Sequence, residues 1–141
     1  PLDRHFAVGN FIRDAIAGGP IVLSGDGTPI RAYMYIGDLV TWLLTVWIDG
    51  EPGRPYNVGT EEGASLLKVA GIAAGLTGLP KSSVEVARQP AQNTYINALV
   101  PDTRRATAEL SLQIKTRLDE SLARTIQFYR HTGYVPDSRD S

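Results

Sequence analysis

The chain has 141 residues, of which 43% are hydrophobic and 21% charged, a composition typical of a folded domain. Its formal net charge of −1, from 14 basic and 15 acidic residues, creates no long-range field for binding nucleic acid or an anionic membrane surface. The absence of cysteine excludes disulfides and zinc–thiolate sites and is compatible with a reducing compartment, so we expect a cytoplasmic protein without a metal. We predict one domain over residues 1–136 and a disordered polar tail over 137–141.

The first elements follow from apolar spacing and turn residues. Residues 8–16 carry apolar side chains at helical spacing, and the Gly-Gly-Pro run that follows ends the predicted helix. Residues 21–24 form a short β-type run, and a Gly-Asp-Gly turn occupies 25–27. Tyrosines at every second position predict an extended segment over 31–36.

The next helix, predicted over 39–48 with Asp38 as its N-cap, has almost no polar face. At ten residues this apolar run is about half of the roughly 20 that a membrane span needs. A helix that is apolar all round needs cover on all sides, and a domain of this size can hardly provide it. We therefore expect part of this surface to contact something outside the chain.

The remaining elements are short. The patterns predict a strand over 55–58, a helix over 66–77 capped by Ser65, an edge strand around Val84 and Val86, and a loop over 89–97. Asp102 is the predicted cap of a short helix to about residue 110, and Thr116 begins the last helix. About five helices with three or four short strands cannot form a doubly wound sheet, so we predict a small mixed α/β lobe.

Catalytic motifs are missing from the sequence. No tyrosine is followed four residues later by lysine, no glycine-rich fingerprint opens a βαβ unit, and no phosphate loop is present. The two histidines, His5 and His131, lie at opposite ends without metal-type spacing. We predict no catalytic residue and no metal site, and expect this chain alone to be inactive. Because it starts at Pro1, we also expect a piece of a longer protein.

Two residues suit binding instead. Arg31 follows the Gly-Asp-Gly turn, and a guanidinium binds phosphate oxygens through a planar fork of donors. Asn57 lies at the end of the predicted strand 55–58, where its amide could donate a hydrogen bond without adding charge. Both have plainer interpretations, a structural ion pair for Arg31 and a turn residue for Asn57.

In order, several segments resemble the second half of extended short-chain dehydrogenases/reductases, the nucleotide-sugar epimerases and dehydratases, including members similar to dTDP-glucose 4,6-dehydratase. The similar segments are Asn10-Phe11-Ile12-Arg13-Asp14-Ala15-Ile16, Gly19 to Gly27, Ile30-Arg31-Ala32-Tyr33-Met34-Tyr35-Ile36-Gly37-Asp38-Leu39, Tyr56-Asn57-Val58-Gly59, Asp102-Thr103-Arg104-Arg105-Ala106, Glu109-Leu110, and the last helix.

The resemblance implies a fold, partners and site residues. The chain would be the C-terminal part of such an enzyme, and an N-terminal Rossmann domain outside this chain would bind NAD or NADP and supply the catalytic tyrosine and lysine. This chain would anchor a nucleoside-diphosphate sugar so that its C4 faces the nicotinamide, and the whole enzyme would be a homodimer. Arg31 would contact the diphosphate and Asn57 the nucleotide, and the other expected contacts are Ile21, Val22, Leu23, Ser24, His5, Phe6, Ala7 and Arg88.

One feature departs from the family pattern, and one alternative function remains. Where relatives have an Arg-Pro-Gly-Asp-type loop, this chain reads Arg88-Gln89-Pro90-Ala91-Gln92-Asn93, so Arg88 is only a substitute for the usual second phosphate arginine.

The alternative is a free-standing binding or interaction module without chemistry. An upstream glycine-rich βαβ unit and a Tyr-x-x-x-Lys motif in the complete reading frame would decide for the enzyme.

Overall fold

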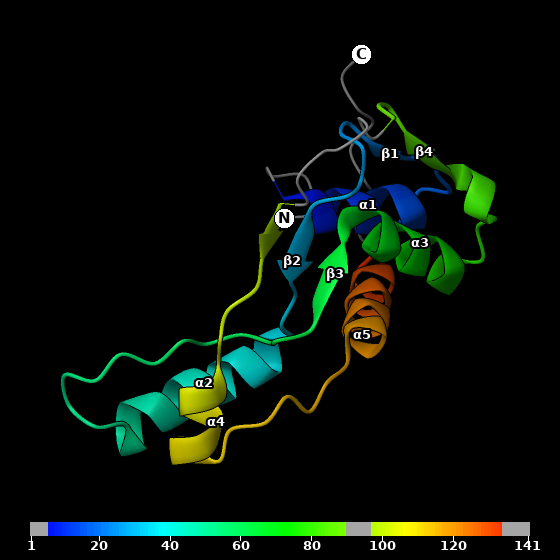
Figure 1. Ribbon diagram of the computed structural model, residues 1–141. Helices are drawn as coiled ribbons and strands as arrows, with labels where there is room; N and C mark the ends of the chain where they lie inside the picture. Colours follow the sequence, from blue (N-terminus) through cyan, green and yellow to red (C-terminus); the bar gives the residue numbers. More distant parts are fainter. Residues whose placement is uncertain (1–5, 90–96, 134–141) are drawn as a thin grey trace. The chain divides into compact units, whose positions relative to one another are not determined.

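A computed structural model describes residues 6–89 and 97–133 (Figure 1). It is a mixed α/β structure whose contacts group the chain into two compact units. Unit 1 comprises residues 1–29, 65–97 and 122–141, and unit 2 comprises residues 30–64 and 98–121. The predicted tail and most of the predicted loop 89–97 lie outside the described residues, and the single-domain boundary stays a prediction.

Unit 1 contains two complete helices, most of the last helix (118–131) and a small parallel sheet. Helix α1 (Ala7–Ile16) packs against α3 (Leu66–Thr77), and both helices contact β1 (Ile21–Leu23). Strand β1 pairs in parallel with β4 (Val84–Val86), which follows the short 3-10 helix η1 (Lys81–Ser83). These elements confirm the helix and strand predictions for this part of the chain. The buried apolar residues of unit 1 are Phe11, Ile12, Ala15, Ile21, Leu23, Val69, Ala70, Ala73, Ala74, Leu122 and Ile126.

Helix α3 begins and ends as its sequence predicts. The Ser65 hydroxyl accepts a hydrogen bond from the Lys68 amide at 3.1 Å, which satisfies one of the free donors of the first turn. Gly78 ends the helix in the left-handed conformation with φ of 81°, which a residue without a Cβ adopts at no steric cost. Local signals at both ends therefore fix the length of α3.

Unit 2 contains a three-stranded sheet and two helices that contact each other. The sheet order is β3 (Gly63–Ser65, whose last residue is grouped with unit 1), β2 (Ile30–Ala32) and β5 (Ala98–Leu99), with β2 and β5 parallel. Helix α2 (Ile36–Asp49) lies beside α4 (Arg104–Leu110) (Figure 1). The core of unit 2 consists of Trp42, Ala106 and Leu112, against which Met34, Val46, Tyr56, Val58 and Leu110 pack.

The start of α2 differs from its prediction. The helix begins at Ile36, three residues before the predicted start, and Tyr35 is its N-cap residue, so Asp38 is not the N-cap. Asp38 is buried, and its Oδ2 accepts hydrogen bonds from the amides of Lys115 (3.1 Å) and Thr116 (2.8 Å). The side chain that looked like a local cap thus binds a segment far along the sequence. The extended segment predicted over 31–36 is accordingly shorter, ending as β2 at Ala32.

The outer face of α2 carries a row of exposed apolar side chains, which we call the α2 stripe. The residues recur at helical spacing, and they range from 48% exposed for Val40 to 82% for Trp47. The expectation that this helix has more apolar surface than the chain covers is confirmed for the described residues. The α2 stripe consists of Ile36, Val40, Leu43, Leu44, Trp47 and Ile48.

Three further boundaries differ from the predictions. The predicted strand 55–58 pairs with no other strand among the described residues. Helix α4 has Thr103 as its N-cap residue, although the Asp102 carboxylate still accepts a hydrogen bond from the Arg104 amide at 3.1 Å. The last helix, α5 (Leu118–His131), starts two residues after Thr116. Strands β3 and β5 were not predicted.

Candidate functional site

The turn before Arg31 is held by its own side chains. Asp26 Oδ1 accepts hydrogen bonds from the Thr28 amide (3.0 Å) and the Thr28 hydroxyl (2.8 Å). The hydrogen bonds from the Thr28 amide and hydroxyl both stabilise the charged carboxylate, so they lower the pKa of Asp26 below its usual value. Gly27 has φ of 74°, and a Cβ there would lie 3.0 Å from atoms of both Leu23 and Leu67. The turn is therefore closely packed within unit 1, and Asp26 stabilises it as a turn residue.

Arg31 lies in β2, where unit 2 begins. Its side chain is half-buried, and Nη1 donates a hydrogen bond to the Ile30 carbonyl at 2.7 Å. Two residues further along lies Tyr33, whose ring is half-buried and whose hydroxyl is fully buried. Burial raises the pKa of Tyr33, and the positive charge of Arg31 partly opposes the rise. The phenol is thus a protonated hydrogen-bond donor at neutral pH.

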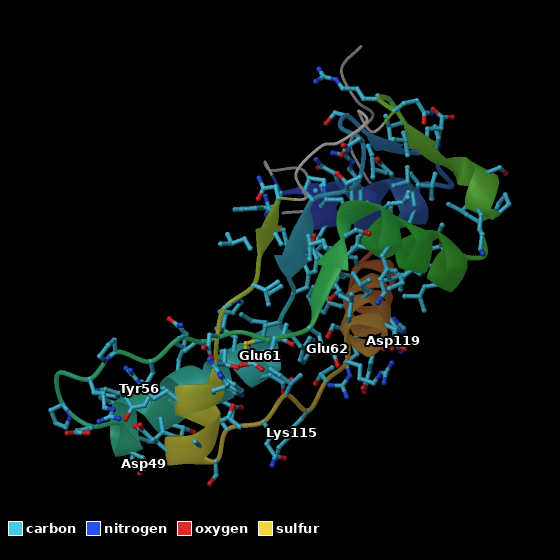
Figure 2. All side chains as sticks on the ribbon, in the orientation of Figure 1. Asp49, Tyr56, Glu61, Glu62, Lys115 and Asp119 are labelled. Atoms are coloured by element: carbon cyan, nitrogen blue, oxygen red, sulfur yellow. The ribbon has the colours of Figure 1, made fainter. Side chains whose placement is uncertain are left out.

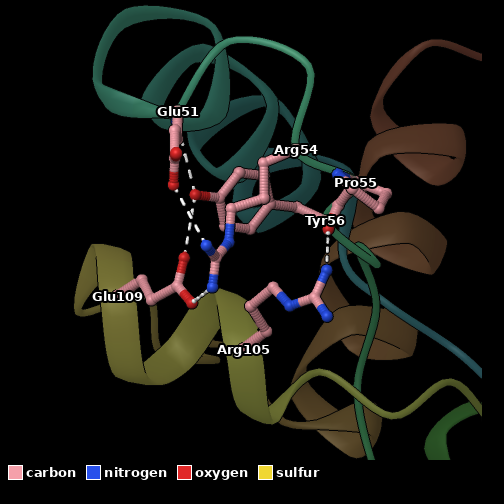
Figure 3. Close-up of polar contacts among 6 residues, drawn as sticks. All are labelled: Glu51, Arg54, Pro55, Tyr56, Arg105 and Glu109. Carbon is pink, nitrogen blue, oxygen red and sulfur yellow. Dashed lines mark hydrogen bonds and ion pairs between the residues drawn. The ribbon is translucent and has the colours of Figure 1, made fainter.

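The segment that carries Asn57 is attached to α4 by side chains from both sides (Figure 3). Glu109 forms an ion pair with Arg54 and accepts a hydrogen bond from the Tyr56 hydroxyl at 3.0 Å. Arg105 Nη1 donates to the Pro55 carbonyl at 2.8 Å. Hydrogen bonding to Glu109, followed by the negative charge of Glu109, raises the pKa of Arg54, so this guanidinium is charged near neutral pH. Together these contacts define the path of residues 54–56 over α4.

Asn57 continues this attachment. Its Nδ2 donates a hydrogen bond to the Asp102 carbonyl at 2.9 Å, so the amide donor is used within unit 2. Beside it lies an open hollow to which α4 contributes two arginines. Arg31 is not among the described residues that line this hollow. The lining residues are Pro55, Asn57, Asp102, Arg104 and Arg105.

Charge in this hollow is largely compensated. Arg104 Nε donates to Asp102 Oδ1 at 3.0 Å and Nη2 to Oδ2 at 2.6 Å, a two-pronged ion pair. The Arg104 side chain, then its amide, lowers the pKa of Asp102 to about 2. The carboxylate of Glu61, which is labelled in Figure 2, accepts hydrogen bonds from the amide (2.9 Å) and the hydroxyl of Thr103. The hollow therefore presents no strong net positive charge for an anionic ligand.

The predicted contacts of unit 1 differ in exposure. Ile21 (0% exposed) and Leu23 (3%) belong to the core, so these side chains have no free surface for a ligand. Phe6 is exposed as the N-cap residue of α1. His5 lies outside the described residues. Val22 and Ala7 are half-buried, Ser24 and Arg88 are exposed, and the contacts of all these residues with a ligand stay predictions.

Sequence reasoning had no signal for several features of this region. Tyr33 appeared only as part of the predicted extended segment and of the family resemblance, because burial of a hydroxyl without a partner cannot be inferred from spacing. Arg104 and Glu109 had entered only through the family resemblance, and Asp102 had been predicted as a helix cap and not as the partner of an arginine. Among the described residues, no three metal-binding side chains gather into a possible metal site, and no helix is long and apolar enough to cross a membrane.

Comparison with known proteins finds one matching family model and several similar enzymes. A sequence profile described as the NAD dependent epimerase/dehydratase family matches residues 3–59. UDP-glucuronic acid decarboxylase 1 of Arabidopsis thaliana is 27% identical over 130 residues, 92% of this chain and 29% of the relative. UDP-glucose 4-epimerase of Mycolicibacterium smegmatis is 27% identical over 131 residues, 93% of this chain and 41% of the relative. The chain is thus similar to the NAD dependent epimerase/dehydratase family over residues 3–59, and to these two enzymes over most of its length.

Solved structures agree on the fold. The UDP-glucose 4-epimerase of Thermotoga maritima with UDP-glucose superposes with a TM-score of 0.81 at 23% identity, over 95% of this chain and 42% of the other. The dTDP-glucose 4,6-dehydratase of Bacillus anthracis with NAD has a TM-score of 0.77 at 20% identity, over 89% of this chain and 39% of the other. The fold is thus that of the C-terminal part of these enzymes. The chain spans less than half the length of these relatives, so their activities do not transfer to it directly.

Proposed function

We propose that the chain is the substrate-binding part of an NAD- or NADP-dependent nucleotide-sugar epimerase or dehydratase. Arg31 carries the proposal, because its half-buried guanidinium lies at the position that the family resemblance assigns to the diphosphate. Among the solved relatives, the Thermotoga maritima epimerase is in complex with UDP-glucose, and the UDP-glucuronic acid 4-epimerase of Bacillus cereus is in complex with UDP-glucuronic acid and NAD. Anchoring the diphosphate would orient the sugar before any chemistry takes place.

The cofactor belongs to a different part of the proposed protein. The sequence of this chain contains neither a glycine-rich βαβ fingerprint nor a Tyr-x-x-x-Lys motif, so its residues do not fit an NAD site. When bound, NAD would accept and return the hydride. We assign binding of the nicotinamide cofactor to an N-terminal domain, and no step of hydride transfer to residues 1–141.

The α2 stripe suggests where that domain would pack. Large exposed apolar side chains on one helix face mark contact surfaces, and this face carries no charge that would attract nucleic acid or lipid head groups. The relatives are longer than this chain, which leaves room for such a domain. We propose that the stripe contacts the NAD-binding domain of the same polypeptide, and that the complete enzyme is a homodimer.

Calorimetric or NMR titration with UDP tests the role of Arg31. We expect weak, millimolar binding by this chain, because the rest of the proposed cleft is outside it, and at least tenfold weaker binding for Arg31→Ala. Arg117→Ala is the matched control, since Arg117 is an exposed arginine of unit 2 paired with Asp119 at 3.4 Å. Equal affinities of the unsubstituted chain and Arg31→Ala would remove Arg31 from the site.

The complete reading frame separates the enzyme from the free-standing binding module. We expect an upstream glycine-rich βαβ unit and a Tyr-x-x-x-Lys motif. A start codon directly before residue 1 would instead support the module and contradict the proposed enzyme.

A further inference from the structure

Trp47 is the most exposed member of the α2 stripe, with 82% of its surface accessible. Four side chains of α2 can donate a hydrogen bond, and three of them donate within this chain. Thr41 and Thr45 donate to carbonyls of their own helix at 2.9 and 3.0 Å, and Trp42 donates to a carbonyl of the segment after α4 at 3.2 Å. The fourth is Trp47, whose indole N–H has no acceptor among the described residues.

The indole of Trp47 combines a large apolar surface with one polar atom. Covering the ring removes apolar surface from water, and tryptophan is enriched among the residues that contribute most to the stability of interfaces. The N–H loses its hydrogen bond to water at the same time, and a buried N–H without an acceptor costs free energy. A surface that fits Trp47 therefore needs an apolar pocket that also holds an acceptor.

This requirement disfavours a second copy of the chain as the partner. The side chains of the α2 stripe are isoleucine, valine, leucine and tryptophan, and none of them has an acceptor atom. A contact between the stripes of two copies covers two indoles and provides an acceptor for neither, which makes it the weaker contact. A different protein surface, with a carbonyl or a carboxylate in its apolar pocket, satisfies both needs.

We propose that Trp47 anchors the contact between the α2 stripe and the NAD-binding domain, and that this domain offers an acceptor to the indole N–H. The inference rests on the proposed function. Val40, Leu43 and Leu44 are 48–50% exposed, so they have less apolar surface left to bury than Trp47 and its neighbour Ile48, which is 71% exposed. The contact is therefore strongest at the C-terminal end of α2.

Two substitutions in the complete protein test the anchor. Trp47→Phe keeps an aromatic ring and deletes the N–H, so we expect the thermal midpoint to fall by about 2–4 °C, because the facing acceptor loses its donor. Trp47→Ala deletes the ring as well, so the midpoint should fall further. In residues 1–141 alone, both substitutions should leave the midpoint nearly unchanged, because Trp47 is exposed there.

Phe128→Ala is the matched control, since Phe128 is also an exposed aromatic residue (62%) but lies on α5, outside the α2 stripe. Its effect on the midpoint should be the same in the complete protein and in residues 1–141. If Trp47→Ala lowers the midpoint of the complete protein and Trp47→Phe does not, the ring is buried without an acceptor and the inference is wrong.

A second outcome also overturns the inference. If neither Trp47 variant behaves differently in the complete protein and in residues 1–141, Trp47 is not an anchor. Neither outcome changes the role of Arg31, which the affinity for UDP measures independently of Trp47. Conversely, equal UDP affinities of the unsubstituted chain and Arg31→Ala would remove Arg31 from the site and leave the anchor to be judged by the thermal midpoints.

Discussion

Helices α2 and α3 are about equally hydrophobic in composition, yet they differ in how much of that surface the chain covers. Helix α3 buries four residues and leaves two large apolar side chains exposed, Leu67 and Leu76. Helix α2 buries only Asp38 and Trp42, while all six residues of the α2 stripe are exposed. The composition of a helix therefore indicates how much of its apolar surface needs to be buried. It does not indicate whether the residues that bury this surface belong to the same chain.

The residue types on the two helices explain part of the difference. The buried positions of α3 are valine and alanines, which let α1 and the β1–β4 sheet approach closely within unit 1. Helix α2 carries leucine, isoleucine and tryptophan on its outer face, side chains that fill a wide contact. We conclude that α3 is completed by its own unit, whereas α2 is suited to a further partner.

The two tryptophans of α2 give the largest expected effect. Trp42 is 2% exposed and its indole N–H donates to the Gln113 carbonyl at 3.2 Å, whereas Trp47 is 82% exposed. Trp42→Ala should lower the free energy of unfolding by about 3–5 kcal/mol, and Trp47→Ala should change it by no more than ~0.5 kcal/mol. Urea denaturation followed by circular dichroism measures both. Similar losses for the two variants would show that α2 has no distinct inner and outer faces.

Self-association tests the outer face itself. We expect this chain to associate at micromolar concentration through the α2 stripe, since water is then removed from apolar surface. Leu43→Glu should weaken the association at least tenfold, about 1.4 kcal/mol, as measured by sedimentation velocity. Gln127→Glu, which adds the same charge at an exposed polar position of α5, is the control. A chain that stays monomeric and highly soluble would argue that the stripe needs no partner.

Local signals predicted unit 1 better than unit 2. Ser65 and Gly78 fix the ends of α3 within a few residues of sequence, so its boundaries could be predicted. The start of α2 could not, because the Asp38 carboxylate binds amides more than 70 positions away. Strands β3 and β5 are too short to have a pattern of their own, and they exist only through pairing with β2. In the described residues, the predicted strand 55–58 has no strand to pair with.

The candidate site shows the same division. The turn that precedes Arg31 was predictable because Asp26 and Thr28 lie two residues apart. The bond of Asn57 to Asp102 was not, since it joins segments 45 positions apart. Sequence located candidate binding residues, but their partners depend on tertiary contacts.

A smaller effect concerns the cap that completes α3. Ser65→Ala removes the hydroxyl that accepts from the Lys68 amide and should cost about 1 kcal/mol of stability. Ser65→Asp should retain most of the stability, because aspartate is also a good N-cap and its charge suits the helix N-terminus. Thermal unfolding of the two variants provides the measurement. Equal destabilisation by alanine and aspartate would mean that the hydroxyl acts through packing and not as a cap.

The smallest effect distinguishes the start of α4 from that of α3. The Ser65 cap is uncharged, so it should not depend on pH, whereas α4 starts beside the Asp102–Arg104 ion pair. The pKa of Asp102 is lowered to about 2 in the folded chain, below its ordinary value of 3.8, so its stabilising contribution is complete above pH 3.8 and is lost as pH falls toward 2. Because both side chains are exposed, salt should weaken the contribution further. Carboxyl NMR titration should find a midpoint near 2 that moves toward 3.8 in Arg104→Gln. An unchanged midpoint would mean that the Arg104 side chain does not hold the carboxylate in its charged form.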